Sequence, residues 1–143
     1  MVTDNSLPVY RSRPGADAMA PAAAATAEQI APGLWCSPGL SNSYLLTTGD
    51  GRVVVNTGMG FEGPVHRANF DAVDSSPVRY VIFTQGHVDH VGGLDSVRDP
   101  DTLVVAQANW TTWRDDNERL IPYRANRSAF AFQEKLATGI RAI

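Results

Sequence analysis

The chain has 143 residues, 43% of them hydrophobic, and 12 Lys and Arg against 15 Asp and Glu give it a net charge of −3. That length suffices for one hydrophobic core, and no apolar run approaches the roughly 20 residues that a membrane span needs. The charge argues against nucleic acid as a partner, because affinity for phosphate requires many Lys and Arg contacts. The single cysteine, Cys36, allows no internal disulfide and suits a reducing cytoplasm.

Residues 1–28 contain little that could pack, since prolines and an alanine cluster dominate and no sustained apolar stretch occurs. The same interruptions make the segment unlike a secretory signal peptide. We therefore expect a disordered Ala- and Pro-rich arm over residues 1–28 and a domain over residues 29–143.

Short β-type runs begin near Ile30. A strand is predicted over residues 34–37, and an antiparallel hairpin over residues 42–56, because the turn at 48–51 contains two glycines that can take positive φ. The next elements are expected in this order: a helix at about 62–73, a strand at 79–84, a short helix near 92–97, a strand at 102–106, and helices at about 108–121 and 128–138.

Three of these strands contain unbroken apolar runs, at residues 53–55, 81–83 and 103–105. Such runs are typical of a sheet that is covered on both faces. Either the helices of this chain cover both faces, or they cover one face and a second sheet from outside the chain covers the other. The pattern alone leaves both arrangements open.

A polar segment with two of the three histidines follows the strand at 79–84; it reads Thr-Gln-Gly-His-Val-Asp-His-Val-Gly-Gly over residues 84–93. The imidazole nitrogens of His87 and His90 and a carboxylate oxygen of Asp89 can converge on one ion such as zinc, iron or manganese. Three ligands are too few for a closed structural site, but they suit an open catalytic one. The alternative is a polar loop in which these groups satisfy one another's hydrogen bonds.

This segment resembles the signature of the metallo-β-lactamase superfamily, Thr-His-x-His-x-Asp-His followed by Gly-Gly. The sequence Asn56-Thr57-Gly58 is similar to the Asp-Thr-Gly turn of that family, and the resemblance covers roughly residues 30–106. The run from His87 to Gly93 is also similar to the alkyl sulfatase branch. The resemblance implies an α/β fold that forms the first half of an αββα sandwich, with a mixed sheet covered by helices on one face.

The resemblance also implies a metal-dependent hydrolase acting on an ester, thioester, sulfate ester or lactam. His87 would belong to a first metal site, and Asp89 and His90 to a second, with one or two zinc ions, or iron or manganese, as the metal. Asp89 would also orient the attacking water, which is the catalytic role. Gln85 stands in place of the first motif histidine, and since its amide oxygen is a weaker donor to zinc, the first site is expected to be depleted.

The family takes its remaining ligands, two histidines and an aspartate, from the second half of its fold, whereas this chain has no histidine after His90. The alternative to a hydrolase that binds a small-molecule substrate is therefore a catalytically inactive, truncated half domain. Such a domain would associate with itself or with a second-half partner through its uncovered sheet face, because large apolar patches are uncommon on monomers.

Other residues are assigned structural roles. His66 is expected to be a solvated surface residue of the helix at 62–73, and Cys36 a small buried hydrophobe. Trp110, Trp113, Leu120 and Ile121 are expected to pack on the core as one face of the helix at 108–121. If that helix flanks a substrate cleft in a complete relative, the two tryptophans would meet an apolar substrate.

Overall fold

The structure is a computed structural model and describes residues 20–25 and 27–123. The chain divides into two units, and residues 21–121 form the unit that contains the sheet and its helices. The helix predicted at 128–138, and the part of the predicted arm before residue 20, lie outside the described residues.

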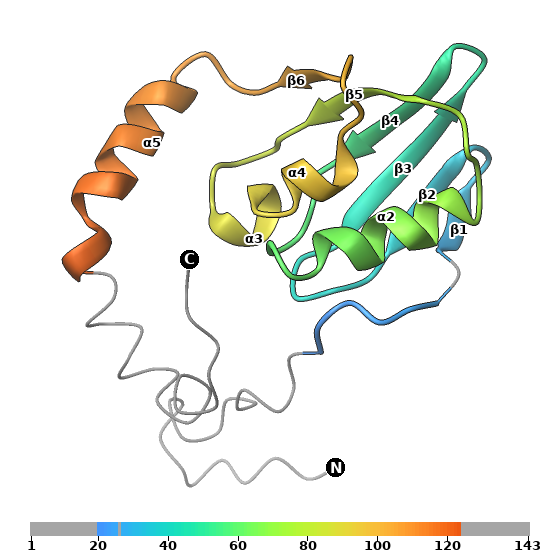
Figure 1. Ribbon diagram of the computed structural model, residues 1–143, viewed down its shortest axis with the longest axis horizontal. Coiled ribbons are helices and arrows are strands. Elements are labelled where there is room, and N and C mark those ends of the chain that lie inside the picture. The colour runs from blue at the N-terminus through green and yellow to red at the C-terminus, as the bar shows by residue number, and fades with distance from the viewer. Residues whose placement is uncertain (1–19, 26, 124–143) are drawn as a thin grey trace, which may run out of the picture. The chain divides into compact units, whose positions relative to one another are not determined.

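The described strands form one six-stranded sheet in the order β1-β2-β3-β4-β5-β6 (Figure 1). Their bounds are β1 (Glu28–Ala31), β2 (Leu34–Ser37), β3 (Ser43–Thr48), β4 (Gly51–Val55), β5 (Val78–Ile82) and β6 (Leu103–Val105). The first four strands pair antiparallel, and β4, β5 and β6 pair parallel. The hairpin predicted over 42–56 is confirmed as β3 and β4, whereas β1 was not predicted.

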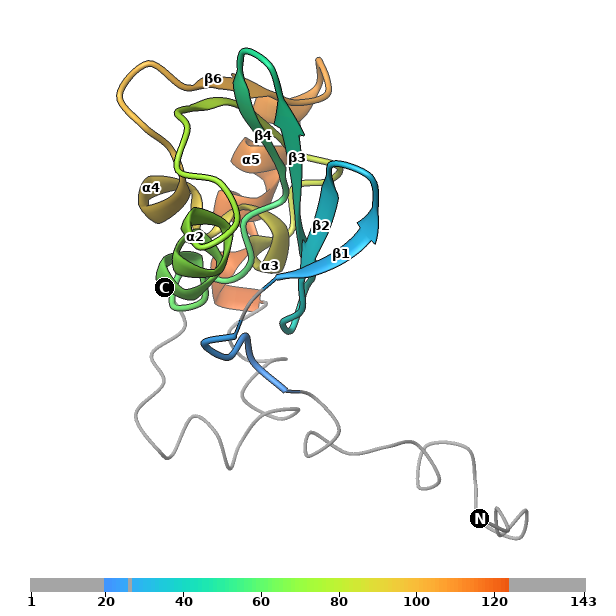
Figure 2. The same cartoon turned by 90° about the vertical axis from the view of Figure 1, so that its right-hand side faces the viewer.

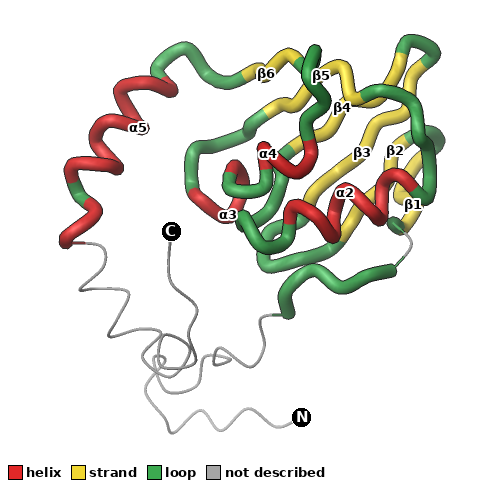
Figure 3. Tube along the Cα trace, in the orientation of Figure 1, coloured by secondary structure: helices red, strands yellow, loops and turns green. Residues whose placement is uncertain are grey.

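Helices occupy the crossovers that parallel strands require (Figure 3). The chain passes from β4 to β5 through α2 (Gly63–Asp71), which has Pro64 in its first turn, and from β5 to β6 through α3 (Val88–Val91) and α4 (Leu94–Val97). After β6 comes α5 (Trp110–Arg119). None of the helices within residues 20–25 and 27–123 has the length and hydropathy needed to cross a membrane.

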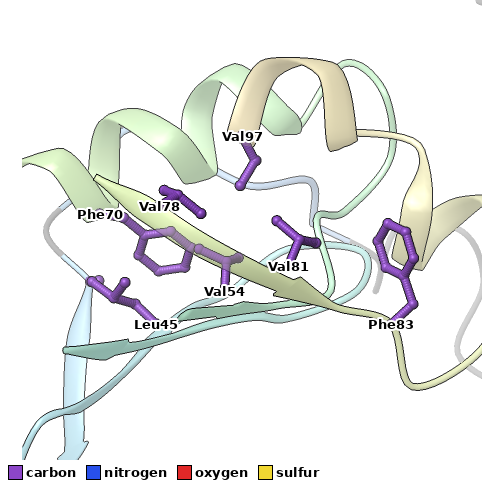
Figure 4. Close-up of a cluster of buried hydrophobic side chains, with 8 residues drawn as sticks. Leu45, Val54, Phe70, Val78, Val81, Phe83 and Val97 are labelled. Atoms are coloured by element: carbon purple, nitrogen blue, oxygen red, sulfur yellow. The ribbon is translucent and has the colours of Figure 1, made fainter. Parts of the chain in front are cut away.

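The hydrophobic core lies between the sheet and the two helices α2 and α4, which lie on the same side of it (Figure 2). Leu45, Val54 and Val81 are paired neighbours on β3, β4 and β5, and each is at most 1% exposed. Phe70 of α2 and Val97 of α4 pack against this row (Figure 4). The helices therefore bury one face of the sheet.

The adjacent row of side chains, which points to the opposite face, remains accessible. Leu46, Val53, Tyr80 and Leu103 are aligned across β3 to β6, and Leu46, Tyr80 and Leu103 are 40%, 44% and 59% exposed. The structure thus confirms a mixed sheet with its helices on one face. Of the two arrangements left open by the apolar strand runs, the described residues match the one in which this chain covers a single face.

The polar side of α2 faces inward. Glu62, His66 and Asn69, spaced at helical intervals, are 0%, 0% and 5% exposed, so the prediction that His66 is a solvated surface residue is wrong. Ser37 and nearby backbone supply hydrogen-bond partners to these buried groups: His66 Nδ1 lies 2.8 Å from Ser37 Oγ, and Asn69 Nδ2 donates to the same hydroxyl at 2.9 Å. Burial lowers the pKa of His66, against the opposing charge of Glu62.

The residues that precede β1 supply further donors to this polar cluster. The backbone N–H of Ala22 donates to Glu62 Oε1 at 2.8 Å, and that of Ala25 donates to Asn69 Oδ1 at 3.0 Å. Ala27 is 3% exposed and belongs to the core. The described end of the arm predicted over residues 1–28 is therefore hydrogen-bonded to α2 and its preceding loop.

Candidate functional site

The predicted site lies where two neighbouring parallel strands end. Asn56 follows β4 and Thr84 follows β5 after one residue, and carboxyl ends of adjacent parallel strands meet at the same edge of a sheet. Asn56 has a positive φ of 58°, which places its side chain against Thr84. Thr84 donates its backbone N–H to Asn56 Oδ1 at 3.1 Å, and Asn56 Nδ2 donates to Thr84 Oγ1 at 3.0 Å.

The two glycines of the motif bring its short helices against the loop after β4. A Cβ on Gly93 would lie 2.1 Å from the carbonyl oxygen of Thr57, and one on Gly92 would lie 2.8 Å from the nitrogen of Gly60. Only glycine fits such a close backbone approach at these two positions. The backbone N–H of Thr57 donates to the carbonyl of His90 at 2.7 Å, which fixes the backbone of that motif histidine.

Three of the four predicted ligand side chains meet at one point. Gln85 Oε1 is in close contact with His87 Nδ1, and Gln85 Nε2 lies 2.7 Å from His90 Nε2. The amide therefore bridges the two imidazoles, accepting from one ring and donating to the other. Ser41 Oγ lies 3.1 Å from His90 Nε2 as well, a neighbour that the sequence did not indicate because it is 49 positions away.

Asp89, the predicted catalytic residue, contacts the same imidazole. Its Oδ2 lies 3.3 Å from His90 Nε2, and the two side chains are 39% and 17% exposed. The Asp89 carboxylate and the Gln85 amide therefore both lie next to the same imidazole nitrogen. All four predicted residues are thus connected: Gln85 and Asp89 contact His90, and His87 contacts Gln85.

The donors suit a transition metal by type but not by number. Imidazole nitrogen, carboxylate oxygen and amide oxygen are all ligands that zinc, iron and manganese accept. Yet in the part of the chain that the structure describes, no group of three or more His, Cys, Asp or Glu side chains is arranged to hold a metal ion. The described residues fit one side of a metal site, with Gln85 occupying a position where an imidazole would add a stronger ligand.

A series of aromatic rings begins at the motif. The ring of His87 meets Trp113 edge-on at 5.8 Å, Trp113 stacks on Trp110 at 5.6 Å, and Trp110 stacks on Phe83 of the core at 5.6 Å. The predicted packing of α5 on the core is therefore found for Trp110, whereas Trp113 stacks on Trp110 and contacts His87 instead. It is not found for the two residues beyond the helix, because Leu120 and Ile121 are 39% and 59% exposed.

The segment that contains this site matches a known family in sequence. A sequence model of the metallo-β-lactamase superfamily matches residues 36–116, more than half of the chain. The chain belongs to the metallo-β-lactamase superfamily. Membership means a hydrolase-type fold in a superfamily that usually binds zinc.

Individual metallo-β-lactamase relatives match only part of the chain. The "lactamase-like protein nscB" of Arthroderma gypseum is 34% identical over 55 residues, which are 38% of this chain and 18% of that protein. The metallo-β-lactamase GOB-18 of Elizabethkingia meningoseptica is 26% identical with a TM-score of 0.50, over 57% of this chain and 32% of that one. A double mutant of the sec-alkyl sulfatase PisA1 shares the fold, at 23% identity and a TM-score of 0.52, over 62% and 16% of the two chains. The chain therefore spans at most about a third of these relatives.

Proposed function

We propose that this chain carries one side of the metal site of a metallo-β-lactamase-type hydrolase, which acts on an ester, thioester, sulfate ester or lactam. The observation that supports this most directly is the convergence of Gln85, His87 and His90, with Asp89 beside them, at the carboxyl ends of β4 and β5. His87 would serve a first metal site, and Asp89 and His90 a second. Zinc is the expected ion, with iron or manganese as alternatives.

Each of these side chains has a distinct task in the proposed reaction. Bound zinc would lower the pKa of water and polarise the bond to be hydrolysed. Asp89 would accept a hydrogen bond from the attacking water and orient it toward the substrate. His90 is positioned for its role by Ser41 at its ring and by Thr57 at its backbone. Gln85 offers only a neutral amide, so the first site would hold its metal more weakly.

The remaining ligands would come from outside the described residues, and the exposed sheet face offers a surface on which the part of the fold that carries them could pack. The row containing Leu46, Tyr80 and Leu103 is apolar and accessible, and the chain spans only 32% of GOB-18. We propose that a polypeptide supplying the rest of the domain packs on this face. Cys36, a free thiol that is itself buried, agrees with a reducing cytoplasm as the compartment.

Metal binding is tested by titrating zinc into the metal-free chain in a calorimeter. The wild type should bind zinc with measurable heat, and a variant carrying both His87→Ala and His90→Ala should lose that binding. Asp95→Asn, an exposed carboxylate outside the cluster (side chain 88% exposed), is the matched control and should bind like the wild type. Equal zinc binding by the wild type and the double variant would show that His87 and His90 are not the ligands.

The partner proposal has a separate measurement, the mass of the chain in solution by light scattering. A lone chain with an accessible apolar face should associate, and Tyr80→Lys combined with Leu46→Lys should return it to a monomer by placing charges on that face. Tyr123→Lys, an exposed aromatic outside the sheet (65% exposed), is the control. A wild-type chain that stays monomeric at high concentration would contradict the proposal. A homodimer would mean that a second copy of this chain covers the sheet face.

A further inference from the structure

A hollow of about 310 Å³ lies directly beside the motif. Residues 83–87 form one side of it, and the segment from Gln107 to Trp113 forms the other. We call it the aromatic pocket, because four of its lining side chains are rings: Phe83, His87, Trp110 and Trp113. A pocket of this size can enclose a small organic group.

The rings form a continuous wall that ends at a proposed metal ligand. Phe83 and Trp110 are nearly parallel, at 21°, and Trp110 and Trp113 are at 30°. His87 stands at 88° to Trp113, so its edge contacts the last indole. Offset and edge-to-face arrangements of this kind are the ones that aromatic groups prefer, and a ligand ring could extend the series.

Gly86 is what allows Trp113 to lie against the motif. A Cβ at residue 86 would come within 2.4–2.7 Å of three atoms of the Trp113 ring, so a larger residue would displace that indole. Both tryptophans are only partly buried in the structure, which leaves aromatic surface facing the pocket. The motif glycine and the α5 tryptophan therefore build the pocket together.

Among the described residues, no Lys, Arg, Asp or Glu lines the pocket. Apart from the imidazole of His87, the polar side chains of its described lining are amides and a hydroxyl, those of Gln85, Gln107, Asn109 and Thr84. A charged group would lose its hydration here without finding an opposite charge. An uncharged flat ring would bury its faces on the indoles at no such cost.

We propose that the aromatic pocket binds an uncharged aromatic ring of the substrate, next to the bond that is hydrolysed. This inference rests on the proposed function, which places the reaction at His87, Asp89 and His90. It narrows the substrate to one with an aryl group close to the reacting ester, thioester, sulfate ester or lactam.

The chain contains three tryptophans, and the third one, Trp35 on β2, is an internal control. We would record the three indole N–H signals of the metal-free, isotope-labelled full chain by NMR while adding 2-naphthol. The signals of Trp110 and Trp113 should shift with a common dissociation constant, while that of Trp35 stays in place. Decahydro-2-naphthol, which has the same carbon skeleton without the flat rings, should bind at least about tenfold more weakly.

Variants then assign the binding to this pocket. Trp113→Ala should weaken 2-naphthol about tenfold, and Trp113→Phe should recover most of the loss. Tyr123→Ala, which deletes an exposed aromatic ring that does not line the pocket, should have no effect. Unshifted signals of Trp110 and Trp113, equal shifts at Trp35, or equal affinity for the saturated analogue would overturn the inference. This readout needs no metal, so the two proposals can fail separately. Binding of naphthol without binding of zinc would refute only the metal proposal. Binding of zinc without binding of naphthol would refute only the proposal that the pocket binds an aromatic ring.

Discussion

Asn56 and Thr84 join the loops after two parallel strands by a pair of hydrogen bonds. The side-chain oxygen Oδ1 of Asn56 accepts a hydrogen bond from the Thr84 backbone N–H at 3.1 Å, and its Nδ2 donates to the Thr84 hydroxyl at 3.0 Å. Asn56 is 5% exposed and has a left-handed backbone, which asparagine tolerates better than most residues. One side chain therefore sets the distance between the loop after β4 and the motif after β5.

Replacing Asn56 should therefore destabilise the edge of the sheet at which β4 and β5 end. We expect Asn56→Ala to lower the free energy of unfolding by about 2 to 4 kcal/mol, because two part-buried hydrogen bonds to Thr84 are lost and alanine is strained at positive φ. Urea denaturation measures this change. Asn56→Asp is the matched control, since it keeps the acceptor for the Thr84 N–H, and it should lose about 1 kcal/mol or less. A similar loss of stability in Asn56→Ala and Asn56→Asp would mean that the hydrogen bond to the side-chain oxygen of residue 56 is not the important one.

Gln85→His should strengthen metal binding. The substitution places an imidazole nitrogen where the amide now contacts His87 and His90, and imidazole is the better donor to zinc. We expect zinc affinity, measured by competition with a chromogenic chelator, to rise by at least about tenfold. Gln107→His, which adds a histidine on the far side of the aromatic pocket, is the control. Unchanged affinity in Gln85→His would show that residue 85 does not face the ion.

The glycine pair of the motif offers a test of close packing. Gly93→Ala should cost about 1 to 3 kcal/mol, because its Cβ would lie 2.1 Å from a backbone oxygen that cannot easily move. Gly49→Ala, in the β3–β4 turn, has no atom within 4 Å of the added Cβ and should change stability by less than about 0.5 kcal/mol. Thermal unfolding of both variants gives the comparison, and equal melting temperatures would contradict the geometry.

His66 should make stability depend on pH. Burial lowers its pKa in the folded chain below the ordinary value of 6.5, so the unfolded chain binds the proton more readily. The stabilisation from the neutral ring is therefore complete above about pH 6.5 and is lost as the pH falls from there toward the folded pKa. We expect the free energy of unfolding to decrease between about pH 7 and pH 5 in the wild type, and to decrease less in His66→Gln.

Ser37→Ala is the control for this pH effect. It removes the hydroxyl that contacts His66 Nδ1 but leaves the buried imidazole, so stability should fall at every pH while the slope persists. The interpretation fails if His66→Gln keeps the wild-type slope.

The sequence predicted the elements that have a strong local signal. Two glycines at residues 49 and 51 indicated the hairpin, and the apolar positions of α2 indicated its helix to within two residues at each end. Strand β1 was missed because its four residues are all exposed. Its existence depends on pairing with β2 rather than on any pattern of its own.

The predicted site was recognised through a motif, whereas its neighbours depend on tertiary structure. Residues 85 to 90 are close in sequence, so their convergence could be expected. Ser41 contacts His90 from a loop that is distant in sequence. His66 is buried against β2, where the hydroxyl of Ser37 is a hydrogen-bond partner of its ring. Helical periodicity placed His66 correctly on a polar face of α2, but could not show that this face is turned toward other polar groups.

The change from antiparallel to parallel pairing at β4 has a consequence for the order of folding. Strands β1 to β4 pair with their neighbours in sequence, so this meander closes only short loops and we expect it to form early. β5 and β6 must wait for helical crossovers, and β6 has three residues that are 44–59% exposed. The motif lies in the crossover between β5 and β6. We therefore expect the sheet edge that carries the motif to be completed last, and its amide hydrogens should exchange with solvent sooner than those of β3 and β4.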